Sequence, residues 1–326
     1  MARPKRPPGG DRLPTGEDAT LERIGRRLEA RQGPPPTGEL WGGDDAAVVH
    51  PGRSDQRLVL TTDAMVAGVH ADLSLVGPAD FGWKALTTAV SDIAAMGGTP
   101  AQALVAVGAP PASALEELAD GLGEAANAWA CPVVGGDLSE ADQLFVAVAV
   151  TGTLEGEGPA VLRSGARPGD ALFVTGPLGA SAAGLRVLTA RRDGQRVAGS
   201  EDLERAHRRP EARLAEGRTA RAAGARAMMD ISDGLGLDLH RLARASAVGF
   251  VLDEVPVAEG ATEAEALGGG EDYELLIAAP DDGRLEEAFA SARLRPPLRI
   301  GTLTKDRREH RLGSVTLSAT GYQHRV

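Results

Sequence analysis

Acidic residues next to glycine, serine or threonine recur along this 326-residue chain. In the densest stretch, 228–236, Asp230 and Asp233 lie on either side of Ser232, and a turn with two glycines follows. Carboxylates gathered in one place repel one another unless cations neutralise them. We therefore expect the acidic segments to converge on one site that binds divalent cations and phosphate. The other segments are 42–45, 61–63, 91–92 and 135–137.

Magnesium suits such a site, because it prefers oxygen ligands and shares phosphate oxygens with one or two carboxylates per ion. Each aspartate taken alone is as readily a helix cap or a turn residue, so the hypothesis depends on the whole group. The hydroxyls of Thr61 and Thr62 could add ligands, although threonine is also common in strands. The candidate metal ligands are Asp44, Asp45, Thr61, Thr62, Asp63, Asp92, Asp137, Asp230 and Asp233.

Common sequence motifs for binding a triphosphate are missing. There is no Gly-Lys pair, hence no Walker A loop, and no His-Arg-Asp of a protein-kinase catalytic loop. Nucleotide phosphates would have to be held by metal ions on carboxylates and by backbone N–H groups of glycine turns. The turn at 176–184 could present a helix N-terminus to an anion or could be a packing turn. Arg163, His70 and Glu271 are further candidates, with plainer interpretations as one of many arginines, a loop histidine and a turn carboxylate.

Composition narrows the classes of partner. The net charge of −11 disfavours nucleic acid, because a phosphate backbone needs a basic surface. Lysine is nearly absent, so direct contacts to phosphate would come mainly from arginine. The single cysteine, Cys131, excludes an intrachain disulfide and a cysteine-rich metal site. No apolar run approaches the roughly 18 residues of a membrane span. We expect a cytoplasmic protein with no membrane partner and a disordered extension at 1–16.

Length and patterning predict two domains, divided within the Gly- and Pro-rich segment 155–169. We place an ATP- and metal-binding domain at 17–155 and a second domain at 160–326. Strands and helices alternate in both halves, which indicates an α/β or α+β fold. Expected strands lie at 46–49, 58–60, 101–107, 133–134, 145–154, 171–175, 227–229, 250–252, 299–303 and 315–317. Another expected strand follows the glycine turn within 268–279. Expected helices lie at 21–28, 80–96, 115–129, 210–223, 235–245 and 285–292. The turn at 176–184 is expected to open another helix, and 191–209 to hold a surface loop and a helix start.

Seven motifs occur in order from about 42 to 322: GGDDAAVV (42–49), TTDAMVAGVH (61–70), WKALTTAVSDIAAMGGTP (83–100), VVGGD (133–137), LRSGARPGDALFVTG (162–176), MDISDGL (229–235) and GGEDYEL (269–275). Together they resemble the thiamine-monophosphate kinase family. SDIAAMG, ISDGL and GGEDYEL are specific in combination, whereas each alone also fits the wider superfamily. That superfamily includes aminoimidazole ribonucleotide synthetase, selenophosphate synthetase and a hydrogenase maturation factor.

The resemblance implies direct, in-line transfer of the γ-phosphoryl group of ATP to thiamine monophosphate, giving thiamine diphosphate and ADP. It implies several Mg²⁺ ions on the candidate ligands, with Asp92, Asp230 and Asp233 as the catalytic carboxylates. It also implies a two-domain fold of the aminoimidazole-ribonucleotide-synthetase type and a homodimer. In that dimer the N-terminal sheets of two subunits would pair into a barrel, with ATP near the interface. The implied nucleotide contacts are Thr62, Gly136, Asp137, Arg163 and Ser232, and the implied substrate contacts are His70 and Glu271.

The sequence departs from the family pattern in places that bear on substrate affinity more than on metal chemistry. Leu138 and Ser139 keep one hydroxyl where the family usually has two, and Val69 replaces a commonly polar residue. Ala319 stands where a tryptophan often stacks on the thiamine rings. Loss of that ring would weaken substrate binding by roughly 1–3 kcal/mol unless another ring replaces it. Tyr322 is the candidate replacement.

Two other classes of function fit less well. Selenophosphate synthetase needs a reactive cysteine near its N-terminus, and the maturation factor ends in a cysteine. Cys131, the single cysteine of this sequence, stands at neither of these positions. Aminoimidazole ribonucleotide synthetase fits the MDISDGL and GGEDYEL motifs less well. A non-catalytic nucleotide or metal sensor would keep the same fold, but the intact acidic residues argue against loss of catalysis.

Overall fold

The computed structural model describes residues 26, 30, 34–41, 43–50, 57–111, 113–156, 158–195, 197 and 200–324. Residues 38–322 form one compact unit, to which everything below applies. The expected extension at 1–16 lies outside the described residues, as does almost all of the expected helix at 21–28.

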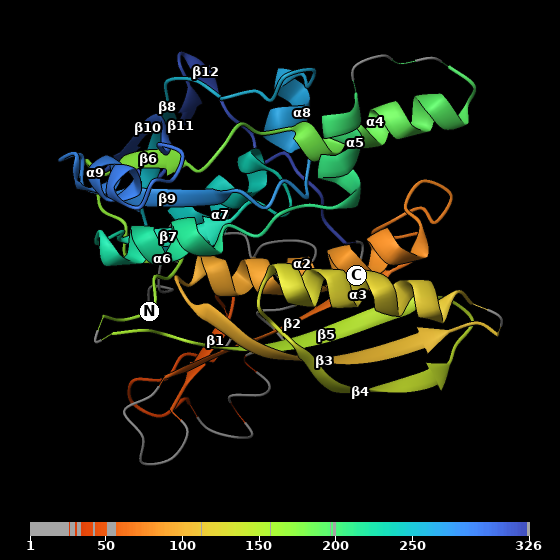
Figure 1. Cartoon of the computed structure of the whole chain (residues 1–326). Helices are drawn as coiled ribbons and strands as arrows, with labels where there is room; N and C mark the ends of the chain where they lie inside the picture. Colours follow the sequence, from red (N-terminus) through yellow and green to blue (C-terminus); the bar gives the residue numbers. More distant parts are fainter. Residues whose placement is uncertain are drawn as a thin grey trace, which may run out of the picture. The chain divides into compact units, whose positions relative to one another are not determined.

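The first half of the unit is a five-stranded mixed sheet in the order β1-β2-β5-β3-β4 (Figure 1). Its strands are rich in Val, Thr and Ala, and alternate side chains of β5 are buried, as expected when one face of a sheet is covered. All neighbours are antiparallel except β3 and β4, which are parallel. The bounds are β1 Ala47–Val49, β2 Leu58–Val66, β3 Thr99–Ala109, β4 Val133–Glu140 and β5 Phe145–Thr153.

Two helices, α2 (Pro78–Ala95) and α3 (Leu115–Ala128), lie on this half, and α2 packs on strands β2, β3 and β5. Proline at the start of α2 suits a position where the N–H would have no helical partner. The two helices cross closely, because a Cβ at Gly121 would lie 1.7 Å from the carbonyl oxygen of Ala79. A glycine is therefore required at that crossing, and α2 is held firmly over the sheet.

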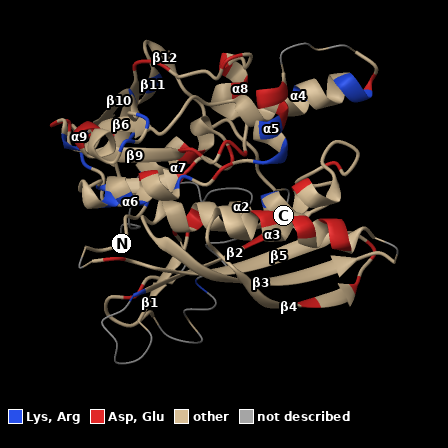
Figure 2. Cartoon of the chain, viewed as in Figure 1, with Lys and Arg blue, Asp and Glu red and all other residues tan. Residues whose placement is uncertain are grey.

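The opposite face of the first sheet is open. Leu104 on β3 is 54% exposed on this face, and every residue of β4 is exposed along the edge. Strands β3 and β5 carry no charged residue, so this face is largely apolar (Figure 2). A long, exposed edge strand beside an apolar face is a typical surface for pairing with another chain.

The second half is a seven-stranded mixed sheet in the order β12-β11-β8-β10-β6-β9-β7. Both of its faces are covered, because alternate residues of β6 belong to two different cores. Leu172 and Val174 pack with α7, whereas Ala171 and Phe173 pack with α6 and α9. The strands are β6 Ala171–Val174, β7 Ala227–Asp230, β8 Gly249–Leu252, β9 Leu275–Ala279, β10 Leu298–Thr304, β11 His310–Leu312 and β12 Val315–Thr316.

Six helices accompany this sheet. Helix α4 packs against α5 and α8, and α8 begins with a capping box in which Thr262 and Glu265 satisfy each other's backbone N–H groups. The bounds are α4 Ala180–Arg192, α5 Glu201–Arg208, α6 Leu214–Ala222, α7 Leu235–Ser246, α8 Glu263–Gly268 and α9 Arg284–Ser291.

Helix α2 joins the two halves. It contacts β2, β3 and β5 of the first sheet, and α6 and β7 of the second half. Ala94 and Ala95 at its C-terminal end belong to the core beneath β6 and β9. Residues of α2 are thus held next to the end of β7, where Asp230 lies.

The predicted alternation of strands and helices is confirmed in both halves. The expected strands at 58–60 and 133–134 were too short, because 61–63 lie inside β2 and 135–137 inside β4. Residues 91–92 lie inside α2, as the expected helix at 80–96 implied. Threonine favours strands, and the glycines of β4 allow close approach, because a Cβ at Gly136 would lie 1.9 Å from the carbonyl oxygen of Val105. Helix α8 and strand β11 were not predicted.

In the described part of the chain, no helix combines the length and apolarity that a membrane span requires.

Candidate functional site

Three aspartates from distant parts of the chain meet at the joint between the two halves. Asp45 precedes β1, Asp92 lies in the last turn of α2, and Asp230 ends β7. Each offers a carboxylate oxygen, and these oxygens lie within 4.8 Å of one another. Asp45 and Asp230 are buried, and Asp92 is half-buried. We call these residues the three-aspartate cluster.

The cluster is electrostatically unfavourable without a cation. Burial raises the pKa of Asp92 well above its ordinary value, and the charges of Asp230, Asp63 and Asp45 raise that pKa further. Burial likewise raises the pKa of Asp230, with a further contribution from Asp45. Like charges held this close require either protons or cations.

Hydrogen bonds hold the cluster from its outer side. Ser91 Oγ donates to Asp230 Oδ2 at 2.6 Å, and Thr61 Oγ1 donates to Asp92 Oδ2 at 2.5 Å. Arg163 Nη2 donates to Asp45 Oδ1 at 2.5 Å. The remaining oxygen of Asp45, Oδ2, is buried and has no hydrogen-bond partner. A convergent set of oxygen donors that includes an unpaired, buried oxygen fits a hard divalent cation such as Mg²⁺.

Asp44 lies beside this cluster and accepts the backbone N–H of Arg163 at 3.0 Å. Burial, and then the charge of Asp45, raise the pKa of Asp44 to about 7. Both predicted acidic residues of the 42–45 segment therefore face the linker that carries Arg163.

Asp63 and Asp233 belong to the same neighbourhood. Burial raises the pKa of Asp63, and the charge of Asp233 raises it further, whereas His70 lowers it. The His70 ring accepts the backbone N–H of Val66 at Nδ1 (3.0 Å). Asp63, His70 and Asp233 are thus brought near the three-aspartate cluster, as expected from the sequence.

Two residues that the sequence analysis missed organise the turn at 231–234. Asp238 Oδ2 accepts the backbone N–H groups of Asp233 (3.0 Å) and Gly234 (3.1 Å). Arg241 Nη1 donates to Asp238 Oδ1 at 2.9 Å and also contacts the carboxylate of Asp233. Their spacing from Asp233 along α7, five and eight residues, is the signal that could have indicated a helix face supporting the turn.

The segment 269–275 interlocks with this turn. Ser232 accepts the backbone N–H of Glu271 at 2.8 Å, and Ile231 accepts that of Tyr273 at 3.0 Å. The backbone N–H of Tyr322 donates to the carbonyl of Asp233 at 3.0 Å, and the Tyr322 side chain is 45% exposed. The predicted residues Ser232, Glu271 and Tyr322 therefore surround the Asp233 turn.

Three predicted residues are not brought to the cluster within one chain. In β2, side chains alternate, so Thr62 lies on the open face of the sheet, opposite to Thr61 and Asp63. Gly136 and Asp137 lie on the exposed edge strand β4. Two strands, β5 and β3, separate β4 from β2, which amounts to a distance of roughly 14 Å across the sheet.

A carboxylate from another segment of the chain hydrogen-bonds to the glycine-rich turn at 176–184. Asp272 accepts the backbone N–H groups of Gly179 (2.6 Å) and Ser181 (3.2 Å) at the start of α4. A carboxylate of the chain itself thus satisfies the helix N-terminus, which favours the packing interpretation of this turn.

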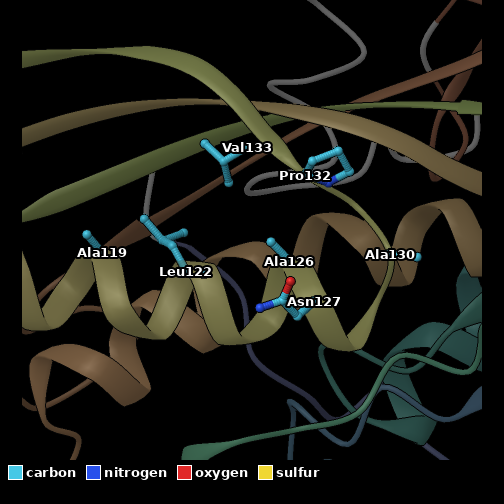
Figure 3. A pocket seen from close by; sticks show the side chains of 8 residues that line it. Ala119, Leu122, Ala126, Asn127, Ala130, Pro132 and Val133 are labelled. Carbon is cyan, nitrogen blue, oxygen red and sulfur yellow. The ribbon is translucent and has the colours of Figure 1, made fainter.

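One hollow lies away from the three-aspartate cluster. It has a volume of about 600 Å³ and lies between α3 and the start of β4, lined by Leu122, Ala126 and Val133 among others (Figure 3). A smaller cavity of about 160 Å³ is lined by Ser181, Glu271 and Asp272 together with arginines of the 205–213 segment. The chemistry of the donor groups therefore locates the candidate site better than cavity volume does.

Comparison with known proteins identifies the family. The model described as "AIR synthase related protein, N-terminal domain" matches residues 43–154, and "AIR synthase related protein, C-terminal domain" matches residues 167–312. Thiamine-monophosphate kinase of Bacillus subtilis is 39% identical over 246 residues, which cover 72% of this chain and 75% of that protein. The chain belongs to the thiamine-monophosphate kinase family.

Further proteins of this family are similar to the chain over most of its length. The Escherichia coli K12 protein is 36% identical over 88% of this chain and 92% of its own length. The solved structure of AaThiL complexed with AMPPCP and TMP has a TM-score of 0.81 and 31% identity, and covers 95% of this chain and 97% of that chain. Thiamine-monophosphate kinase from Stenotrophomonas maltophilia has a TM-score of 0.73 and 32% identity, with 91% and 96% covered. The expected two-domain fold of the aminoimidazole-ribonucleotide-synthetase type is confirmed.

Proposed function

We propose that this chain transfers the γ-phosphoryl group of ATP to thiamine monophosphate, forming thiamine diphosphate and ADP. The observation that carries the proposal is the convergence of Asp45, Asp92 and Asp230 from three distant segments, with Asp63 and Asp233 beside them. Membership of the thiamine-monophosphate kinase family supplies the reaction and the acceptor.

The main barrier to this reaction is repulsion between two anions, because the attacking oxygen and the transferred group both belong to phosphates. Bound Mg²⁺ would neutralise and align these phosphates. The three-aspartate cluster, with Asp44, Asp63, Asp233 and Thr61, would hold the ions. A phosphate oxygen needs no strong general base, so the reaction does not require a dedicated proton acceptor.

Fixed hydrogen bonds would keep the ligand oxygens in place during turnover. Ser91 holds Asp230, Thr61 holds Asp92, and Asp238 holds the backbone of Asp233. Arg163 stands at the margin of the cluster with 26% of its side chain exposed, so its guanidinium is accessible to a nucleotide phosphate. We assign Arg163 and Ser232 to the nucleotide, and His70, Glu271 and Tyr322 to the thiamine phosphate.

A homodimer would bring the remaining predicted residues to a site. Thr62 and Asp137 both point to the open face of the first sheet, and Gly136 lies on its exposed edge. Pairing of this face with its copy in a second subunit, as a barrel, would cover the apolar side chains of β3 and β5. It would also place these residues near the nucleotide of one of the two subunits.

The reaction is tested by incubating the purified chain with ATP, MgCl₂ and thiamine monophosphate and measuring thiamine diphosphate and ADP. We expect equal amounts of both products, a requirement for free Mg²⁺ in the millimolar range and no product with a chelator. Nucleotide binding without turnover would instead identify a non-catalytic sensor. Turnover with a different acceptor only would identify another enzyme of the superfamily. We also predict a cytoplasmic location.

A further inference from the structure

Lys84 is a buried lysine at the joint between the two halves. It lies on α2, its side chain has no exposed surface, and its Nζ donates to Glu271 Oε2 at 2.9 Å. The two residues are 187 positions apart in the chain. Burying an ammonium group away from water costs free energy unless a partner of opposite charge contacts it. The carboxylate of Glu271 is that partner for Lys84.

His207, on α5, lies next to the same carboxylate, but its ring is uncharged near pH 7. The ring is 3% exposed; its Nδ1 lies 3.1 Å from Ser181 Oγ and 3.6 Å from Glu271 Oε2. Burial and the charge of Lys84 lower the pKa of His207 to about 4, so the ring is neutral near pH 7. Among the described residues, Lys84 is therefore the charged ion-pair partner of Glu271 near pH 7.

The backbone around Glu271 is held in an unfavourable conformation. Glu271 has φ +67° and Tyr273 has φ +51°, values that residues other than glycine adopt rarely and at a cost of about 1–3 kcal/mol. The backbone bond from Glu271 to Ser232 and the two bonds that Asp272 accepts from α4 maintain this conformation. Such strain is typical of segments that aim a side chain at a ligand.

The Glu271 side chain is 25% exposed and lines the cavity of about 160 Å³. One side of its carboxylate thus contacts buried Lys84, and another side is accessible. Thiamine monophosphate carries a positively charged thiazolium ring and an amino group on its pyrimidine. A carboxylate held in a fixed orientation would attract the charge or accept the N–H groups.

We propose that Lys84 is a positioning residue that keeps the Glu271 carboxylate oriented for the thiamine part of the acceptor. This inference rests on the proposed function. Lys84 does not contact the acceptor in this account, so it acts on acceptor binding through Glu271 and leaves ATP binding and the phosphoryl-transfer step largely unaffected.

The test compares steady-state kinetics of the wild type with Lys84→Met, which keeps the length of the side chain and removes its charge. We expect the KM for thiamine monophosphate to rise at least about tenfold, with kcat and the KM for ATP changed less than about threefold. Lys305→Met is the matched control, because Lys305 is exposed in the turn after β10. It should behave as the wild type.

A double-mutant cycle separates positioning from a general effect on the fold. If Lys84 acts through Glu271, adding Lys84→Met to Glu271→Gln should change the KM for thiamine monophosphate by less than about twofold. Additive effects of the two substitutions would overturn the inference, as would an unchanged KM in Lys84→Met. Lys84→Gln, which retains an N–H donor, serves as the second variant if thermal unfolding shows that Lys84→Met does not fold.

The outcomes distinguish the two levels of the proposal. A wild type that turns over thiamine monophosphate while Lys84→Met keeps its KM overturns the positioning role alone. A wild type that does not turn over thiamine monophosphate overturns the proposed function and the positioning role with it.

Discussion

His207 shows how a single buried residue makes stability depend on pH. In the unfolded chain its pKa is near 6.5, and in the folded protein burial lowers this pKa to about 4. Lys84, Arg208 and Glu271 are the charged groups that act on it, and Ser181 of α4 hydrogen-bonds to its ring. Because the unfolded state binds more protons between these two values, the free energy of unfolding falls as the pH falls through that window.

We predict that His207→Gln removes this pH dependence. Wild-type stability should lose about 2 kcal/mol from this group between pH 7.5 and pH 5. Urea unfolding of both proteins at the two pH values gives the measurement. Asp272, whose pKa burial raises to about 7, contributes in the opposite direction, but it is present in both proteins. The free-energy gap between wild type and variant should therefore shrink as the pH falls; a constant gap would show that His207 is not buried as a neutral ring.

At the scale of single elements, the turn at 231–234 depends on the first turn of α7. Asp238 is fully buried, and its carboxylate accepts two backbone N–H groups of the turn and one N–H of Arg241. Without these bonds, the backbone donors of Asp233 and Gly234 would be buried without partners. The orientation of the Asp233 carboxylate thus depends on a helix that follows it in the sequence.

We predict that Asp238→Asn lowers the free energy of unfolding by about 1–3 kcal/mol, since the amide group offers only one accepting oxygen. Turnover should fall as well, because Asp233 is no longer held in place. Glu287→Gln is the control, since Glu287 is an exposed acidic residue in the first turn of α9. If Asp238→Asn unfolds and turns over like Glu287→Gln, the turn does not depend on α7.

At the same scale, most helices and strands could be predicted from the sequence, because hydrophobic spacing is a local signal. The expected strand at 58–60 ended too early, so the alternation that turns Thr62 away from Thr61 and Asp63 was not predicted. The pairs Lys84–Glu271 and Asp230–Ser91 join positions more than 130 residues apart, so no local pattern contains them. The acidic motifs indicated Asp45, Asp92 and Asp230, which converge, but also Asp137, which lies apart on β4. The partners that hold the converging residues required the fold.

At the scale of the whole molecule, the open face of the first sheet is not covered by any described helix of the same chain. It carries exposed Leu104 beside a fully exposed edge strand. Burying apolar side chains of this kind stabilises association by roughly 25 cal/mol per Å² before the costs of binding. The sequence could not indicate this face, since exposure depends on which surfaces the helices cover.

We predict that the wild type is a dimer at micromolar concentration and that Leu104→Asp is a folded monomer, because a charge would be buried in the paired face. Sedimentation velocity measures both. Leu185→Asp is the matched control, since Leu185 is 42% exposed on α4, away from this sheet. A monomeric wild type, or a dimer that survives Leu104→Asp, would rule out this interface.

The central claim is that Asp45, Asp92 and Asp230 hold the cations on which phosphoryl transfer depends. The most direct measurement is the kcat for thiamine diphosphate formation by Asp230→Asn at saturating ATP, MgCl₂ and thiamine monophosphate. Asp253→Asn serves as the control, because Asp253 is an exposed residue paired with Arg299. The account predicts a loss of at least about 100-fold for Asp230→Asn in a folded protein, and wild-type turnover for the control. Turnover by Asp230→Asn within about threefold of the wild type would contradict it.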